Sequence, residues 1–171
     1  ELPGENADGE ALRYLDLISD SSGSLYLVVQ AYERRVDAAG AVQEIILSEE
    51  VQTWNGDGVQ QDSVLLVDKT TLSQYSTQPY ILKLQMQGET LLALCCDQGR
   101  FDVIQAHPYS DEAAAVLASY DLGDEAAELE DCAALSDGTL LYSTKGGGLY
   151  AWAPEGERRD LSQLAGRTCL A

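Results

Sequence analysis

The stretch Asp137-Gly138-Thr139-Leu140-Leu141-Tyr142 decides the predicted fold, because weaker copies of it recur along the chain. Gly23-Ser24-Leu25-Tyr26 and Gly88-Glu89-Thr90-Leu91-Leu92 repeat its order of a turn glycine followed by a strand-like run. A second glycine then opens another such run in residues 99–104 and 148–152. This order is typical of consecutive antiparallel hairpins in a repeating all-β protein.

Four strands within about 40–50 residues is the spacing of β-propeller blades. Approximate repeats fall at residues 12–48, 49–78, 79–123 and 129–166, of which the second is degenerate. The sequence therefore predicts one all-β domain over residues 1–171, a partial β-propeller-like stack of three or four antiparallel blades. A β-sandwich with irregular hairpins is the structural alternative.

Two local features refine this prediction. Residues 113–120 are rich in alanine, but they fall where the last strand of a repeat belongs, so we expect a strand there. Residues 91–96 form an apolar run that reads as a buried strand, in which the adjacent Cys95 and Cys96 face opposite sides. The spacing of the cysteines matches no zinc pattern. If the chain is extracellular, a disulfide between Cys132 and Cys169 is an alternative to free thiols.

The charge of the chain narrows the classes of partner. Ten Lys and Arg stand against 29 Asp and Glu, for a formal net charge of -19. This excess of negative charge disfavours nucleic acid as a partner, because phosphate groups would be repelled. It indicates an acidic surface that keeps the chain soluble. The alternative is that the surface attracts a cation or a basic partner. No run reaches the roughly 18 apolar residues that a membrane span needs, so we expect no membrane insertion of this segment.

The chain begins at Glu1 and its only methionine is Met86, so we expect a processed or truncated piece of a longer protein. A partial propeller would also have exposed edge strands, which predicts pairing with a neighbour or with further chain.

Residues 21–40, SSGSLYLVVQAYERRVDAAG, and residues 137–156, DGTLLYSTKGGGLYAWAPEG, resemble blade-like repeats of secreted bacterial proteins. They are most similar to the propeller-like N-terminal repeat regions of large extracellular solute-binding lipoproteins of Gram-positive gut bacteria. The resemblance implies an extracellular or cell-surface anchored module, linked to solute uptake, and it carries over no functional residue.

Motifs that could carry chemistry all have simpler interpretations. His107, the only histidine, precedes Pro108 in a loop without a nucleophile motif. Residues 55–58, Asn-Gly-Asp-Gly, resemble part of a calcium loop but lack its further oxygen ligands, so we expect a turn. The acids around residues 124–131 read as a solvated loop, and the glycines at 146–148 read as a hairpin. We expect no catalytic residue, metal or cofactor.

Aromatic side chains are the best candidates for a binding surface. Tyr150 and Trp152 lie two apart on one predicted strand and so face the same side, while Trp54 sits in a turn-rich segment. Such residues stack on sugars or line peptide grooves, although they pack more often between sheets. We therefore expect a non-enzymatic binding or scaffolding module for a protein or carbohydrate ligand. The alternatives are a fragment of a propeller-type hydrolase or lyase, and a structural spacer.

Overall fold

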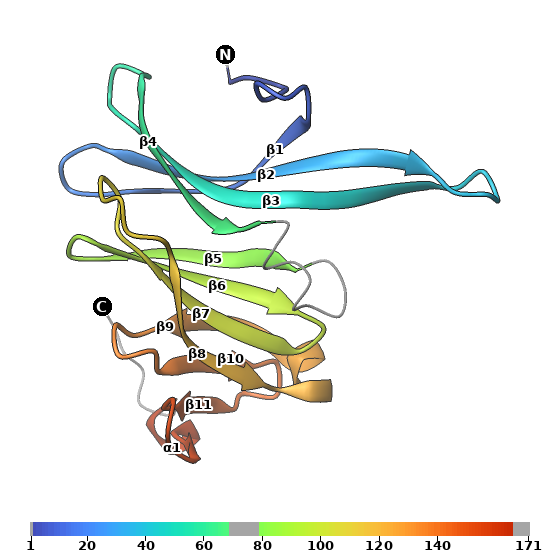
Figure 1. Cartoon of the computed structure of the whole chain (residues 1–171). Helices are drawn as coiled ribbons and strands as arrows, with labels where there is room; N and C mark the ends of the chain where they lie inside the picture. Colours follow the sequence, from blue (N-terminus) through green and yellow to red (C-terminus); the bar gives the residue numbers. More distant parts are fainter. Residues whose placement is uncertain (1, 69–78, 166–171) are drawn as a thin grey trace.

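The structure, a computed structural model, describes residues 2–68 and 79–165, in which β-strands are the dominant secondary structure. The strands form three antiparallel sheets of four, each in chain order (Figure 1), and the all-β prediction is thereby confirmed. The first sheet comprises β1 (Ala11–Ser19), β2 (Leu25–Val36), β3 (Val42–Trp54) and β4 (Gln60–Val67). The second comprises β5 (Tyr80–Gln87), β6 (Thr90–Asp97), β7 (Arg100–Ala106) and β8 (Ala115–Asp121). The third comprises β9 (Leu129–Ala134), β10 (Leu140–Thr144), β11 (Leu149–Trp152) and β12 (Arg158–Asp160).

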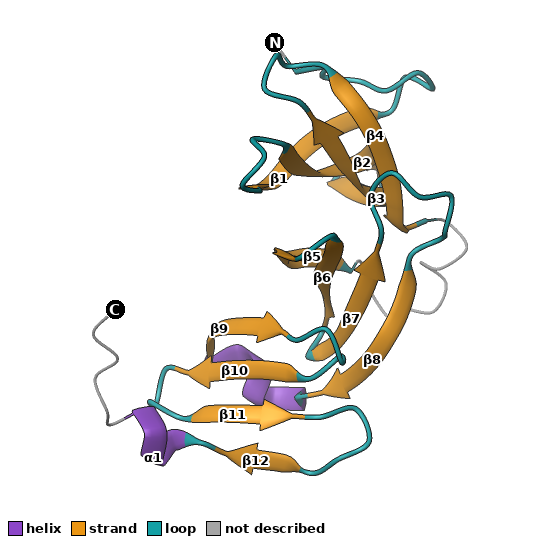
Figure 2. Ribbon diagram, turned by 90° about the vertical axis from the view of Figure 1, so that its left-hand side faces the viewer, coloured by secondary structure: helices purple, strands orange, loops and turns teal. Residues whose placement is uncertain are grey.

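Figure 2 shows the three sheets fanned one beneath the other, as blades are in a propeller-like stack. The first strands of the sheets meet on one side of the fan, where β1 contacts β5 and β5 contacts β9. Each of these strands is also the terminal strand of its own sheet. We call this side, formed by β1, β5 and β9, the inner rim.

The first sheet combines the residues of two expected repeats. Residues 12–48 and 49–78 were expected as separate units, but β3 runs without a break from Val42 to Trp54 and pairs with both β2 and β4. Glu49, the first residue of the expected second repeat, lies inside β3, where it is fully buried and accepts a hydrogen bond from Gln30 of β2. The described residues thus form three blades, and the part of the second expected repeat at residues 69–78 lies outside the described residues.

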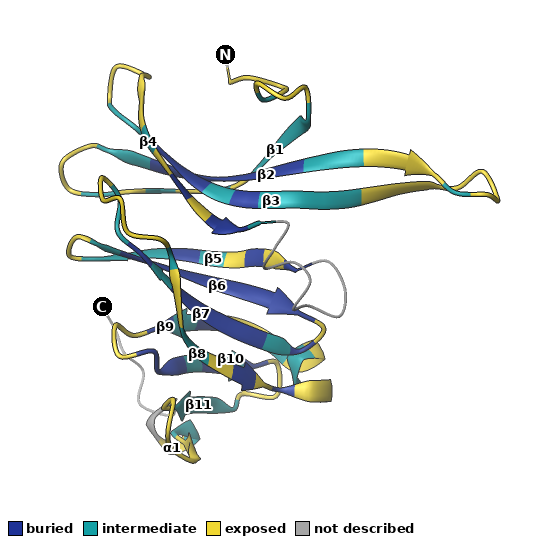
Figure 3. Cartoon of the chain, viewed as in Figure 1, coloured by how far each residue is buried: buried dark blue, intermediate teal, exposed yellow. Residues whose placement is uncertain are grey.

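Two apolar cores separate the sheets, and β6 contributes to both. Leu91, Ala93 and Cys95 pack in the first core, between the first and second sheets. The alternate residues pack in the second core, between the second and third sheets: Leu92, Leu94 and Cys96. Figure 3 shows β6 buried along its length, whereas the far end of the β2–β3 hairpin is exposed. The predictions of a buried strand and of thiols on opposite sides are both confirmed.

Glycine turns connect the strands, as the repeated sequence phrase predicts. In four turns, three of them between paired strands and one before β1, an Asp or Asn side chain accepts two backbone N–H bonds, and a glycine with positive φ follows three residues later; the pairs are Asn6/Gly9, Asp20/Gly23, Asp37/Gly40 and Asn55/Gly58. Glycine adopts this left-handed conformation without the steric cost that a Cβ brings. In the deciding phrase, the carbonyl of Gly138 accepts a 2.6 Å hydrogen bond from the Tyr120 hydroxyl, which ties this turn to β8.

A short 3-10 helix, η2 (Gly123–Glu128), joins the second and third sheets, and a single helical turn, α1 (Ser162–Ala165), follows β12. The strand expected at residues 113–120 is present as β8.

Candidate functional site

The three aromatic residues predicted to bind a ligand do not come together. Trp54 ends β3 on the outer face of the first sheet, where its indole N–H donates a 3.2 Å hydrogen bond to Oε1 of Gln52. Tyr150 and Trp152 lie on β11 and both pack against the second core, as their spacing predicts.

Tyr150 and Trp152 use their rings for internal packing. The Tyr150 ring stacks on Tyr142, with ring centres 5.1 Å apart and planes inclined by 29°. The Trp152 ring lies 5.3 Å from that of Tyr120. Aromatic pairs with such geometry stabilise cores, so the described contacts favour the packing interpretation of these two residues.

At the inner rim, by contrast, side chains from several strands line a single cavity. A cavity of about 520 Å³ lies where the first and second sheets meet, a volume within the range of small-ligand sites. We call it the rim cavity. Its lining comes from four strands, β1, β2, β3 and β5, and mixes aliphatic, aromatic and polar side chains: Arg13, Leu15, Gln30, Tyr32, Glu44, Ile46, Tyr80, Ile81 and Leu82.

Two β-bulges place leucines in the rim cavity. The register of β1 with β2 shifts between Tyr14 and Asp16, which makes Leu15 the extra residue. The register of β5 with β6 shifts between Ile81 and Lys83, which makes Leu82 the extra residue. A bulge redirects a side chain that regular alternation would place elsewhere, and both leucines remain partly exposed on the cavity wall.

The charged groups at the rim cavity are paired with one another. The Arg13 guanidinium donates to a carboxylate oxygen of Glu44, and Arg34 reaches the other oxygen at 3.0 Å. These hydrogen bonds lower the pKa of the Glu44 carboxyl, and the one from Arg13 has the largest effect. Arg13 also lies 4.5 Å from the centre of the Tyr32 ring, in cation–π contact. Two guanidinium groups thus share the carboxylate of Glu44, so a paired polar wall with a net positive charge lies beside the aliphatic wall of the cavity.

A buried carboxyl lies behind this wall. Gln30, which lines the rim cavity, donates from Nε2 to Oε1 of Glu49 at 2.5 Å. The other carboxyl oxygen of Glu49, Oε2, is buried without a hydrogen-bond partner. Burial disfavours the charged form and raises the pKa of Glu49 to about 7. Gln30 thus connects the cavity to a titratable group inside the first core.

A second hollow adjoins the rim cavity. It measures about 720 Å³ and shares Tyr80 and Leu82 with the rim cavity, so these two residues stand between them. Its remaining lining runs from Phe101 of β7 to Ala126 and Ala127 of η2. The inner edge of β5 is therefore flanked on both sides by ligand-sized space.

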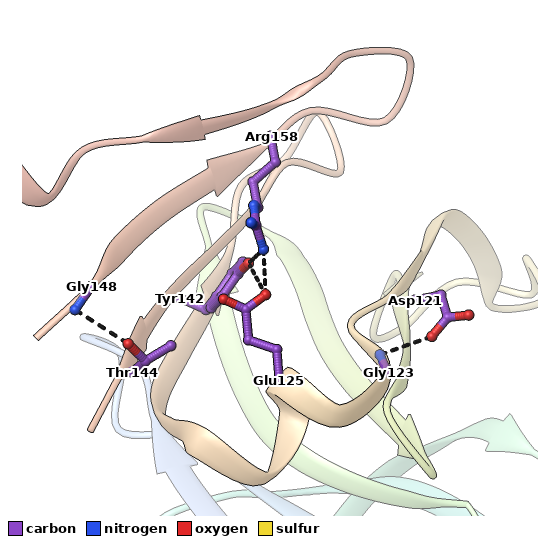
Figure 4. A network of polar contacts seen from close by, with 7 residues as sticks. All are labelled: Asp121, Gly123, Glu125, Tyr142, Thr144, Gly148 and Arg158. Carbon is purple, nitrogen blue, oxygen red and sulfur yellow. Dashed lines mark hydrogen bonds and ion pairs between the residues drawn. The ribbon is translucent and has the colours of Figure 1, made fainter. Parts of the chain in front are cut away.

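A polar cluster fixes η2 against the third sheet (Figure 4). The Arg158 guanidinium donates to Oε2 of Glu125 and, at 2.9 Å, to the Tyr142 hydroxyl, which itself donates to Glu125 at 3.3 Å. Arg158 also lies 4.8 Å from the centre of the Tyr150 ring. Every group in this cluster is engaged with another, which indicates a structural role.

The other motifs behave as turns and loops. The amide oxygen of Asn55 accepts the N–H groups of Asp57 and Val59, so it completes a turn. Among residues 2–68 and 79–165, no group of three or more His, Cys, Asp and Glu side chains could hold a metal ion. Cys132 is a free buried thiol whose pKa burial raises to about 11, and Cys169 lies outside the described residues. No described helix is long and apolar enough to cross a bilayer.

Sequence reasoning did not find the rim cavity. Leu15 and Leu82 look like ordinary strand residues, because nothing in a single sequence marks the bulges that turn them toward the inner rim. Gln30 and Glu49 lie 19 positions apart, and only the pairing of β2 with β3 brings them together. Comparison with known proteins found no match: no family model, no curated protein and no solved structure.

Proposed function

We propose that this chain is a non-enzymatic, extracytoplasmic binding module of a larger surface lipoprotein, and that the rim cavity is its recognition site. The observation that carries the proposal is the pair of bulges that directs Leu15 and Leu82 into one cavity of about 520 Å³. Two neighbouring blades contribute to this site, so binding depends on how the sheets are stacked. The resemblance to repeat regions of solute-binding lipoproteins supports the location and the link to solute uptake.

The lining favours a protein ligand over a carbohydrate. Sugars bind by stacking on open aromatic faces, but Arg13 lies over the Tyr32 ring. Aliphatic residues, by contrast, dominate the wall around the bulges: Leu15, Ile46, Ile81 and Leu82. An aliphatic side chain of a peptide fits such a wall, and Arg13 and Glu44 beside it supply polar groups for the peptide backbone.

The alternative of a hydrolase or lyase fragment has weaker support. The carboxyl with a pKa near 7, Glu49, would be the natural proton donor. It is fully buried and its Oε1 is already engaged by Gln30, so it supports the structure of the site rather than chemistry on a ligand.

Backbone amide chemical shifts test the proposal directly. The probes are capped pentapeptides rich in leucine and, in parallel, cellopentaose and maltopentaose. We expect the peptides to shift the amides of residues 13–15 and 80–82 in a saturable way. Shifts there with the sugars alone would contradict the peptide class, and an unaffected rim with both probe types would contradict the site.

A pair of matched variants sharpens this test. Leu82→Asp places a charge in the rim cavity and should abolish the peptide-induced shifts. Leu135→Asp is the control, because Leu135 is 40% exposed against 37% for Leu82 but lies outside the cavity lining. Equal loss of binding in both variants would argue against recognition at the rim.

A further inference from the structure

The end of the β2–β3 hairpin extends beyond the rest of the first sheet. β1 pairs with β2 only as far as Tyr32, and β4 pairs with β3 only from Glu49 onward. Residues 33–45, here called the arm, therefore form a two-stranded ribbon that projects past the other sheets (Figure 1). A two-stranded ribbon is only marginally stable by itself, so a further contact along the arm would stabilise it.

One face of the arm continues the wall of the rim cavity. Strand pairing places Tyr32 opposite Ile46, and both residues line the cavity. Side chains two residues further along a strand lie on the same face. The next two pairs on this face are Arg34–Glu44 and Val36–Val42. The cavity thus leads into a row of side-chain pairs along the arm.

The outermost pair of this row is apolar. Val36 is 69% exposed and Val42 is 64% exposed, and they lie opposite each other on the two strands. Val36 follows Tyr32 by four residues, which is about 13 Å along a strand. An extended peptide would therefore reach from the aliphatic wall of the cavity to the valine pair within five residues.

The middle pair carries an excess of positive charge. Arg13 and Arg34 both bond to the single carboxylate of Glu44. Each guanidinium has five N–H donors, more than one carboxylate can use. The same two arginines could therefore bind a second carboxylate from a ligand.

The remaining charges of the arm do not compensate this excess. Glu33 and Arg35 alternate with Arg34 along β2, so they lie on the opposite face, where they form an ion pair. Asp37 belongs to the hairpin turn, and its carboxylate accepts the backbone N–H groups at residues 39 and 41. The face toward the cavity thus keeps two guanidinium groups against one carboxylate, in a chain whose formal net charge is -19.

We propose that the rim cavity and the arm together bind an extended peptide in which an acidic side chain stands between two aliphatic ones, in the order Leu-x-Glu-x-Leu. This inference rests on the proposed function of the rim cavity and extends that site along the arm. One leucine occupies the cavity, the glutamate bonds to Arg13 and Arg34, and the second leucine packs on Val36 and Val42. Every second side chain of an extended peptide faces the same side, which matches the spacing of the pairs.

A series of capped peptides tests the charge requirement. Fluorescence anisotropy measures the affinity of labelled Leu-Ser-Glu-Ser-Leu and of versions with Gln or Lys in the middle. We expect the Glu peptide to bind about 10-fold more tightly than the Gln peptide, because its carboxylate makes charge-assisted hydrogen bonds. The net charge of -19 favours the Lys peptide at long range. Equal or tighter binding of the Lys peptide would therefore overturn the proposal.

Two matched arginine variants locate the carboxylate. Arg34→Gln should reduce the advantage of the Glu peptide over the Gln peptide to about 3-fold or less. Arg35→Gln is the control, because both side chains are 65% exposed but Arg35 lies on the opposite face of the arm. The control should keep the full preference. The same loss in both variants would contradict a specific contact with Arg34.

Chemical shifts separate this inference from the proposed function. The capped tripeptide Leu-Ser-Glu should shift the amides of residues 13–15 and 80–82 alone. The pentapeptide Leu-Ser-Glu-Ser-Leu should also shift the amides of residues 34–36 and 42–44. Shifts at the cavity without shifts on the arm would overturn this inference and leave the proposed function standing. With no shift at either place, both would be wrong.

Val36→Thr combined with Val42→Thr tests the apolar pair and keeps the branched shape that suits a strand. The double variant should weaken the Glu pentapeptide by about 10-fold, since hydroxyl groups would be buried against leucine. The affinity of the tripeptide should not change. Val116→Thr is the control, at a residue 53% exposed on β8. Equal weakening in the control would contradict the role of the arm. A dimer of the protein alone that the double variant abolishes, seen by light scattering, would assign the arm to a second copy instead.

Discussion

The amide of Gln30 donates a 2.5 Å hydrogen bond to the buried carboxyl of Glu49, and this contact joins β2 and β3 beneath the rim cavity. It explains why β3 continues through a charged stretch of sequence. Titration of the same carboxyl should make the free energy of unfolding depend on pH.

Stability should fall between pH 4.5 and about pH 7 on account of Glu49. Its pKa in the folded state is raised to about 7 from the ordinary 4.5, so the folded chain favours the protonated form. The contribution is complete below pH 4.5 and is lost as the pH rises through 7, amounting to about 3 kcal/mol. Glu49→Gln should remove this decline in the free energy of unfolding, measured by urea denaturation at several pH values.

Glu50→Gln is the matched control for this prediction, one residue along the same strand on the opposite face. It should keep the decline that the wild type shows. A wild type and a Glu49→Gln variant that differ by a constant amount at every pH would contradict the role of Glu49.

Gly99→Ala should destabilise the fold more than the same change at other glycines. Gly99 has a φ of +90°, and a Cβ there would stand 2.7 Å from the carbonyl oxygen of Gly123. Gly88 has a φ of +64° with open space around it, so Gly88→Ala adds conformational strain alone. We expect a loss of about 1 kcal/mol for Gly88→Ala and clearly more for Gly99→Ala. Thermal melts check this order, with Gly146→Ala as the neutral reference.

Gln85 should hold the second and third sheets together. Its Oε1 accepts the backbone N–H of Ala134 at 2.8 Å, and Gln87 donates to the Ala134 carbonyl at 2.8 Å. Gln85→Ala leaves a buried donor unsatisfied and should cost about 1–3 kcal/mol. Hydrogen exchange at the Ala134 amide should accelerate more than at the Leu140 amide. Equal acceleration at both amides would indicate global destabilisation instead.

Tyr142→Phe should weaken the attachment of η2. The change keeps the ring stacked on Tyr150 but removes the hydroxyl that links Arg158 and Glu125. A loss of about 1 kcal/mol is expected for such a bond. Urea denaturation measures it, and Glu125→Gln in the Tyr142→Phe background should then cost less than in the wild type. Additive effects would show that the two groups act independently.

The sequence indicated most of the strands, but it did not indicate the full length of β3 and β4 or their grouping in one sheet. Turn glycines and alternating runs have local causes, so β6, β8 and the hairpins could be predicted. The boundary expected between residues 48 and 49 falls inside β3, where Glu49 is bonded to Gln30, 19 positions earlier on β2.

The candidate site was harder to predict, because it depends on contacts between sheets. The aromatic pattern correctly put Tyr150 and Trp152 on one side of a strand, but it could not show that Tyr142 and Tyr120 occupy their faces. The bulged leucines of the inner rim carry no signal in a single sequence.

The double role of β6 has a consequence for folding. Because its alternate residues belong to two cores, the middle blade cannot open without exposing both, while either end blade can detach and expose one. Stability in such a stack is nearly a sum over neighbouring units, so the ends should fray before the centre. The molecule should therefore unfold inward from its two ends, with the amides of β6 the last to exchange with solvent.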